Sequence, residues 1–144
     1  MQVYIQVQYT INNIYTSILL MSGGPQGNWY LADINQNCHD ACQAANRECS
    51  EEQLYLHNID VDTSEEVLTL VQTLGGTISA TSCSGQYGTA LEVPLYSTSN
   101  GFCLFSNEAR QLSSFDCKMV PIPFSEKKRR LCWCHHSVEG KNIF

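Results

Sequence analysis

Eight cysteines are the residues of this sequence most able to do chemistry, and their number is even. They are Cys38, Cys42, Cys49, Cys83, Cys103, Cys117, Cys132 and Cys134. An oxidising compartment would join such a set into four bridges, whereas a reducing one would use it as metal ligands or reactive thiols. Because the spacings suit bridges better, we predict four disulfides, no cofactor, and an extracellular or secretory-lumen location.

Two of the cysteine spacings fit each other. Cys38 and Cys42 lie one helical turn apart, which places their β-carbons ~5–6 Å from each other. Cys132 and Cys134 flank Trp133 on one face of a strand, at a separation of ~6.6–6.8 Å. A helix lying along a strand could therefore join both cysteines of one element to both of the other. Either order of pairing satisfies this geometry.

The order of pairing is suggested by similarity to scorpion-toxin and defensin folds, which also join a CxxxC helix to a CxC strand. Cys49 returns to within about 20° of the Cys38 face if the helix continues that far, and Cys117 is its natural partner. The outermost bridges would then tie the beginning of the domain to its end. The predicted nested scheme is Cys38–Cys132, Cys42–Cys134, Cys49–Cys117 and Cys83–Cys103.

The elements that must position these cysteines can be predicted from caps and periodicity. Asn37 is a good N-cap, and two capping boxes begin at Ser50 and Thr63. The stretch 77–124 is rich in Gly and Pro, which indicates short strands and long loops. We therefore expect an α+β fold, with two or three short helices on a small, mainly antiparallel sheet. The predicted helices are 38–48, 50–57 and 64–74, and the predicted strands are 29–32 and 130–135.

The length of 144 residues predicts one domain. We divide the chain into an N-terminal appendage (1–27), a cysteine-rich domain (28–136) and a C-terminal tail (137–144). The appendage contains an alternating stretch typical of a strand and an apolar run, 14–21, that is too short to span a membrane. That run lacks the positive flank of an ordinary signal peptide. A strand, an atypical signal and a remnant of a longer protein all remain open.

The succession of motifs carries a resemblance to a known family. Its parts are Trp29–Ala32, Cys38-x3-Cys42-x6-Cys49, Phe115-x-Cys117 and Arg129-Arg130-Leu131-Cys132-x-Cys134. This order resembles the cysteine-rich C-terminal segment of N-acetylglucosaminyltransferase V, the Golgi enzyme that adds the β1,6 branch to N-glycans. It is also similar to free-standing secreted cysteine-rich domains of algae and other microbial eukaryotes. The resemblance covers about residues 28–136, and the pairing that it implies agrees with the nested scheme.

The enzyme's activity does not follow from this resemblance. In that family the sugar-nucleotide and acceptor sites belong to a large domain with two Rossmann-like halves, which 144 residues cannot hold. We therefore expect a non-catalytic secreted or luminal module that binds a glycan or another secreted protein. The alternative is the C-terminal fragment of a Golgi glycosyltransferase, and the sequence upstream of Met1 would distinguish the two. A small secreted inhibitor or toxin-like effector is a third possibility that no residue supports.

Six residues are candidates for ligand binding. The run from Lys127 to Arg130 is four consecutive positive charges in an acidic chain, suited to sulfated or acidic glycans or to anionic lipid headgroups. The alternative is that these charged side chains are simply exposed to solvent at the start of a strand. Aromatic side chains could stack on sugar rings, although in such domains they more often belong to the core. The net charge of −6 argues against nucleic-acid binding. The candidates are Lys127, Lys128, Arg129, Arg130, Trp29 and Trp133.

Catalytic and metal-binding patterns are weak. No serine or cysteine lies in a recognisable nucleophile motif, and Gly75-Gly76 follows a predicted helix, unlike a phosphate loop. His39, His135 and His136 lie beside cysteines, but bridges would use the thiols that zinc needs. The stretch 60–66 resembles the start of a calcium loop, yet it lacks the required Gly and Glu. We predict no catalytic and no metal-ligating residues.

Overall fold

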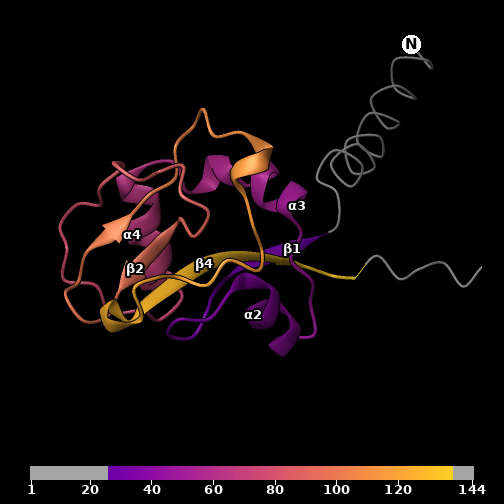
Figure 1. Ribbon diagram of the computed structural model, residues 1–144, viewed down its shortest axis with the longest axis horizontal. Coiled ribbons are helices and arrows are strands. Elements are labelled where there is room, and N and C mark those ends of the chain that lie inside the picture. Colours follow the sequence, from indigo (N-terminus) through magenta and orange to yellow (C-terminus); the bar gives the residue numbers. More distant parts are fainter. Residues whose placement is uncertain (1–25, 138–144) are drawn as a thin grey trace, which may run out of the picture.

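The computed structural model describes residues 26–137, and the domain is an α+β fold of the predicted kind (Figure 1). The predictions for 1–25 and for 138–144 lie outside the described residues. The helices are α2 (Cys38–Ala44), α3 (Glu51–Leu56) and α4 (Ser64–Thr73). The strands are β1 (Gly27–Leu31), β2 (Leu95–Ser97), β3 (Cys103–Leu104) and β4 (Lys128–His135). Short 3₁₀ turns are η1 (Asn58–Asp60), η2 (Leu112–Ser114) and η3 (Phe124–Glu126).

The last strand lies inside the sheet, whose order is β1-β4-β2-β3 with antiparallel neighbours. The C-terminal part of β4 pairs with β1, and its first three residues pair with β2. Figure 1 shows α2 and α3 on opposite sides of β4. Because side chains alternate along a strand, Cys132 and Cys134 face α2 while Leu131 faces the core of α4. Both faces of β4 are therefore covered.

The helix after Asn37 ends earlier than predicted. The side chain of Asn37 caps it by accepting a hydrogen bond from the Asp40 amide, but α2 stops at Ala44 instead of about Glu48. Asn46 adopts a left-handed conformation with φ of 55°, and the Arg47 amide donates back to the carbonyl of Cys42. These features form a Schellman motif, which terminates a helix. Cys49 consequently lies beyond α2, so the helical-face argument for its partner was wrong.

Of the two predicted capping boxes, only the one at Thr63 forms completely, because the Gln53 side-chain oxygen makes no return bond to Ser50. The Ser50 side chain accepts from the Gln53 amide at the start of α3. Thr63 and Glu66 form a full capping box at the start of α4, where each side chain bonds the other residue's amide. Buried Val67 and Val71 give α4 its core-facing stripe. The final strand begins two residues before the predicted Arg130, because Lys128 and Arg129 pair with β2.

Four disulfides join the elements, and the described residues contain no free cysteine. The two outer bridges interleave, since each joins one cysteine of α2 to one of β4 with Cα separations of 5.3 and 5.2 Å. The other two are nested inside them. The observed pairs coincide with the preferred scheme: Cys38–Cys132, Cys42–Cys134, Cys49–Cys117 and Cys83–Cys103.

We predict that the two outer bridges are not additive in stability. Removing either one by paired Cys→Ala changes should cost roughly 2–3 kcal/mol, because the other still closes nearly the same long loop. Removing both should cost more than the sum of the two single losses, because the long loop itself is then open. Guanidinium denaturation of the oxidised variants measures these costs. Equal, additive losses would show that the bridges stabilise the fold independently.

Candidate functional site

The basic run does not form one charged surface. Lys127 is exposed and Arg129 is half-buried, whereas Lys128 and Arg130 are 5% and 1% exposed. The reason is the alternation of β4, which turns every second side chain of the run inward. Both expectations for this run, a ligand-binding patch and a solvated strand entrance, are therefore wrong for Lys128 and Arg130.

Lys128 is the centre of a buried ion-pair cluster. Its Nζ lies 3.1 Å from Glu92 Oε1 and 3.1 Å from Glu126 Oε2, and it also donates to the carbonyl of Ile122. The other carboxylate oxygen of Glu92 accepts from the Ile122 amide. The ammonium group thus has all three of its donors engaged inside the protein.

Arg130 binds carbonyls of the loops through its two terminal nitrogens. Its guanidinium donates to the carbonyls of Asp116 and Met119 at 2.8 and 2.9 Å and to that of Leu91 at 3.1 Å. Burial lowers the pKa of Arg130 to about 10, although nearby carboxylates oppose the shift. These contacts fasten the loop before β2 and the loop after η2 to the central strand.

Substitutions in the basic run can separate structural from ligand-binding roles. We expect Lys128→Ala to destabilise the domain by about 3–5 kcal/mol, because it leaves the Glu92 carboxylate buried without its partner. The matched control Lys127→Ala should change stability by less than about 0.5 kcal/mol. Chemical denaturation measures both, and equal effects would contradict the assigned roles.

The two candidate tryptophans lie together but in different settings. Trp29 and Trp133 are direct partners across β1 and β4, with ring centroids 5.7 Å apart in an edge-to-face arrangement. The His57 ring stacks on Trp133 at 3.5 Å. The indole nitrogen of Trp133 is enclosed, and this ring lines no described hollow. Trp133 therefore packs against Trp29 without lining the groove.

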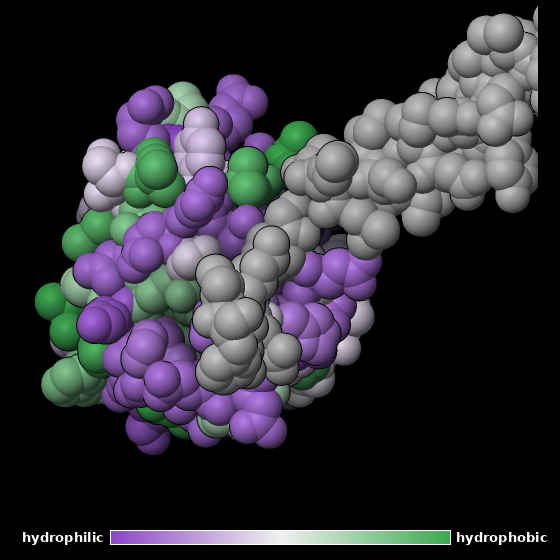
Figure 2. Space-filling view, turned by 90° about the vertical axis from the view of Figure 1, so that its right-hand side faces the viewer, coloured by the Kyte–Doolittle hydropathy of each residue, from purple (hydrophilic) through white to green (hydrophobic). Residues whose placement is uncertain are grey.

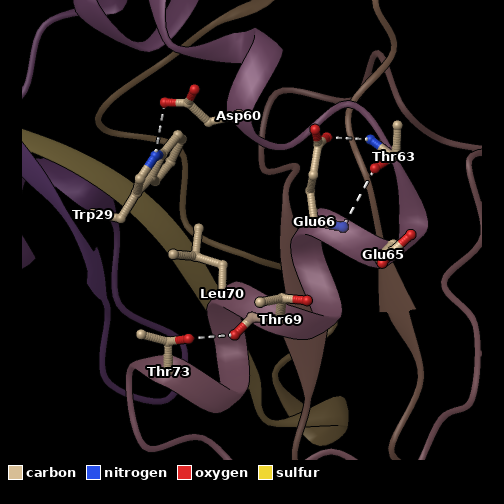
Figure 3. A pocket seen from close by; sticks show the side chains of 8 residues that line it. All are labelled: Trp29, Asp60, Thr63, Glu65, Glu66, Thr69, Leu70 and Thr73. Atoms are coloured by element: carbon tan, nitrogen blue, oxygen red, sulfur yellow. Dashed lines mark hydrogen bonds between the residues drawn. The ribbon is translucent and has the colours of Figure 1, made fainter.

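Trp29 lines a groove of about 630 Å³ between β1 and α4 (Figure 3). The Trp29 Nε1 donates to Asp60 Oδ2 at 3.1 Å, and His57 Nδ1 lies 3.0 Å from the same oxygen. Asp60 therefore fixes the indole in place from η1. The lining residues are Trp29, Asp60, Thr63, Glu65, Glu66, Thr69, Leu70 and Thr73.

The groove is acidic and rich in hydroxyl groups. Glu65 and Thr69 are exposed on α4, while Thr63 and Glu66 are engaged in the helix cap. No lysine or arginine lines the groove. Carboxylates accept hydrogen bonds and repel anions, so this lining suits neutral polyhydroxyl ligands and disfavours sulfated ones. The capping spacing was visible in the sequence, but only the fold brings Trp29 to α4.

The predicted metal-binding stretches do not assemble into a site. Every cysteine beside His39, His135 and His136 is in a disulfide. In the stretch 60–66, Asp60 binds Trp29 and Glu66 caps α4. Within the part of the chain that the structure describes, no three His, Cys, Asp or Glu side chains are placed to hold a metal ion.

Asp62 is an electrostatically unfavourable member of this acidic stretch. Burial raises the pKa of its carboxyl group, and the neighbouring carboxylates of Glu66 and Glu108 raise it further. A raised pKa means that the folded state binds a proton more tightly than the unfolded chain, whose value is near 3.8. Stability is consequently lost as the pH rises from that value through the folded pKa.

The sign of this effect can be tested with a neutral side chain. We expect Asp62→Asn to raise the melting temperature at pH 7, because it removes the disfavoured charge. The gain should disappear below pH 3.8, where the aspartic acid is neutral in both states. Thermal unfolding of both proteins across this pH range measures the difference, and a gain that persists in acid would contradict the assignment.

Comparison with known proteins gives no family assignment, since no protein-family model matches the chain and no curated protein shows significant sequence similarity. Among residues 26–137, no helix has the length and apolar character needed to cross a bilayer. The four disulfides are typical of proteins that fold in an oxidising, extracellular-type environment.

Proposed function

We propose that this domain is a non-catalytic, disulfide-stabilised module of the cell exterior or secretory lumen that binds a neutral glycan in the Trp29 groove. The observation that carries the proposal is the placement of an indole beside carboxylates and hydroxyls in one open hollow. An indole offers an apolar face to the C–H groups of a sugar ring, and carboxylates accept hydrogen bonds from its hydroxyls.

The dimensions and rigidity of the groove support this proposal. Its volume of about 630 Å³ is in the range of small-ligand sites and suits a short oligosaccharide. Trp29 is held by Trp133 on one side and by Asp60 at its nitrogen. An aromatic side chain that is fixed before binding loses little conformational entropy when a ligand arrives.

The absence of basic side chains from the groove lining sets the ligand class. The sequence suggested sulfated or acidic glycans because of the run Lys127–Arg130, but half of that run is buried. A uronate or sulfate in the groove would meet Asp60, Glu65 and Glu66. Like charges at such distances repel, so neutral hexose or N-acetylhexosamine units fit the lining better.

A glycan array probed with the oxidised full-length chain tests the proposal, and we expect binding to neutral oligosaccharides. Thr69→Arg should abolish binding by filling the groove from an exposed helical position. The matched control Gln72→Arg adds the same charge on the same helix outside the groove and should bind like the unmodified protein. Isothermal titration with the best glycan gives the affinities, and equal loss in both variants would refute the groove assignment.

The relationship with the C-terminal segment of N-acetylglucosaminyltransferase V is a further proposal. It is supported by the cysteine spacing, which here joins a helix to the last strand through two bridges. In that case the module would work in the Golgi beside a catalytic domain. An upstream reading frame with Rossmann-type strands supports this relationship, whereas an ordinary signal sequence supports the free module.

A further inference from the structure

A second hollow, distinct from the Trp29 groove, lies where α3 and η1 meet the loop before η2. Its volume is about 380 Å³, and it shares no lining residue with the groove. Figure 2 shows a largely hydrophilic face of the molecule that is interrupted by hydrophobic residues. The residues that line the hollow are Tyr55, Leu56, Asn58, Ile59, Asp62, Glu108 and Arg110.

The walls of this hollow are unusually apolar for a surface. Ile59 is 70% exposed, Leu56 47% and Tyr55 45%. These three side chains come from adjacent turns, since α3 ends at Leu56 and η1 begins at Asn58. Single exposed hydrophobic residues are ordinary, but several around one hollow are typical of an interaction site.

The floor of the hollow offers no free hydrogen-bonding group. Asn58 donates to the carbonyl of Asn107 at 2.8 Å, and its oxygen accepts from Ser106. The Arg110 guanidinium lies 3.9 Å from the centre of the Phe115 ring, and its donors are taken by internal partners. These partners are the carbonyls of Val93, Ala90 and Ser114 and the hydroxyls of Ser106 and Ser114. A ligand would therefore gain binding free energy from the floor and walls through apolar contacts.

The rim of the hollow carries uncompensated negative charge. Asp62 and Glu108 both line it, and neither takes part in an ion pair within residues 26–137. The one cation at the hollow, Arg110, is 2% exposed and directs its charge at internal carbonyls. Bringing a positive charge to this rim would relieve the repulsion between the two carboxylates.

We propose that this hollow binds a segment of a protein partner in which an apolar side chain is flanked by lysine or arginine. The apolar side chain would contact Tyr55, Leu56 and Ile59, and the basic residues would pair with Asp62 and Glu108. A second copy of this chain fits less well, because it would bring a second acidic rim and a further net charge of −6.

The probe is a fluorescein-labelled peptide, GRKILRKG, titrated into the oxidised full-length protein and followed by fluorescence anisotropy. Two matched peptides serve as controls: GRKSSRKG keeps the charge without the apolar residues, and GEEILEEG keeps the apolar residues with opposite charge. We expect the first peptide to bind roughly tenfold or more tightly than either control. Its affinity should fall as salt is added, because the rim charges are exposed.

Variants locate the binding to this hollow. Ile59→Ser and the double variant Asp62→Asn with Glu108→Gln should each weaken GRKILRKG binding roughly tenfold. Ile34→Ser removes an equally apolar, 50% exposed side chain from the β1–α2 connection and should leave binding unchanged. Melting curves confirm that each variant is folded.

Several outcomes would overturn the proposal. Equal affinity for GRKILRKG and GRKSSRKG would show charge attraction alone, and unchanged binding in Ile59→Ser would show that the peptide binds elsewhere. A dimer in sedimentation equilibrium that Ile59→Ser dissociates would identify a second copy as the occupant. Glycan binding at the Trp29 groove is measured independently, so its failure would leave this result untouched.

Discussion

The central constraint on this fold is the position of β4, which is the last strand along the chain but an inner strand of the sheet. It lies between α2 on one side and the core of α4 on the other. Two interleaved disulfides fasten one face of this strand to α2, and hydrogen bonds join its edges to β1 and β2. A segment from the end of the chain is thus enclosed by segments from its beginning and middle. Because closing so long a loop costs chain entropy, the two bridges between α2 and β4 stabilise this arrangement.

Enclosing β4 also explains the charged interior. The strand begins with basic residues, and because both of its faces are covered, Lys128 and Arg130 are buried. Their charged groups pair with Glu92 and Glu126 or bond loop carbonyls. Such contacts satisfy the backbone of long loops that have little regular structure of their own. The charges that looked available for ligands thereby organise the domain instead.

The two surface hollows take neighbouring residues from one turn but differ in chemistry. Asp60 of η1 turns toward Trp29 and the groove along α4, whereas Ile59 of the same turn projects into the other hollow. The groove combines an indole with hydroxyls and carboxylates, which suits a sugar. The second hollow has apolar walls and a satisfied floor, which suits a side chain of a protein. One short turn between two helices therefore contributes neighbouring side chains to two hollows of different chemistry.

Local signals in the sequence determined the three helices and the strands β1 and β4, whereas the positions of β2 and β3 were not predicted. The caps at Asn37, Ser50 and Thr63 set the beginnings of the helices, and the CxxxC and CxC spacings set which elements bridges could join. Only the tertiary structure decided that α2 ends at a left-handed Asn46, and that Trp29 reaches a groove while Trp133 does not. It also decided that Lys128 and Arg130 are buried. The physical reason is that caps and spacings act through neighbours in the chain, whereas burial depends on which distant segments cover a strand, and that information is absent from any short stretch of sequence.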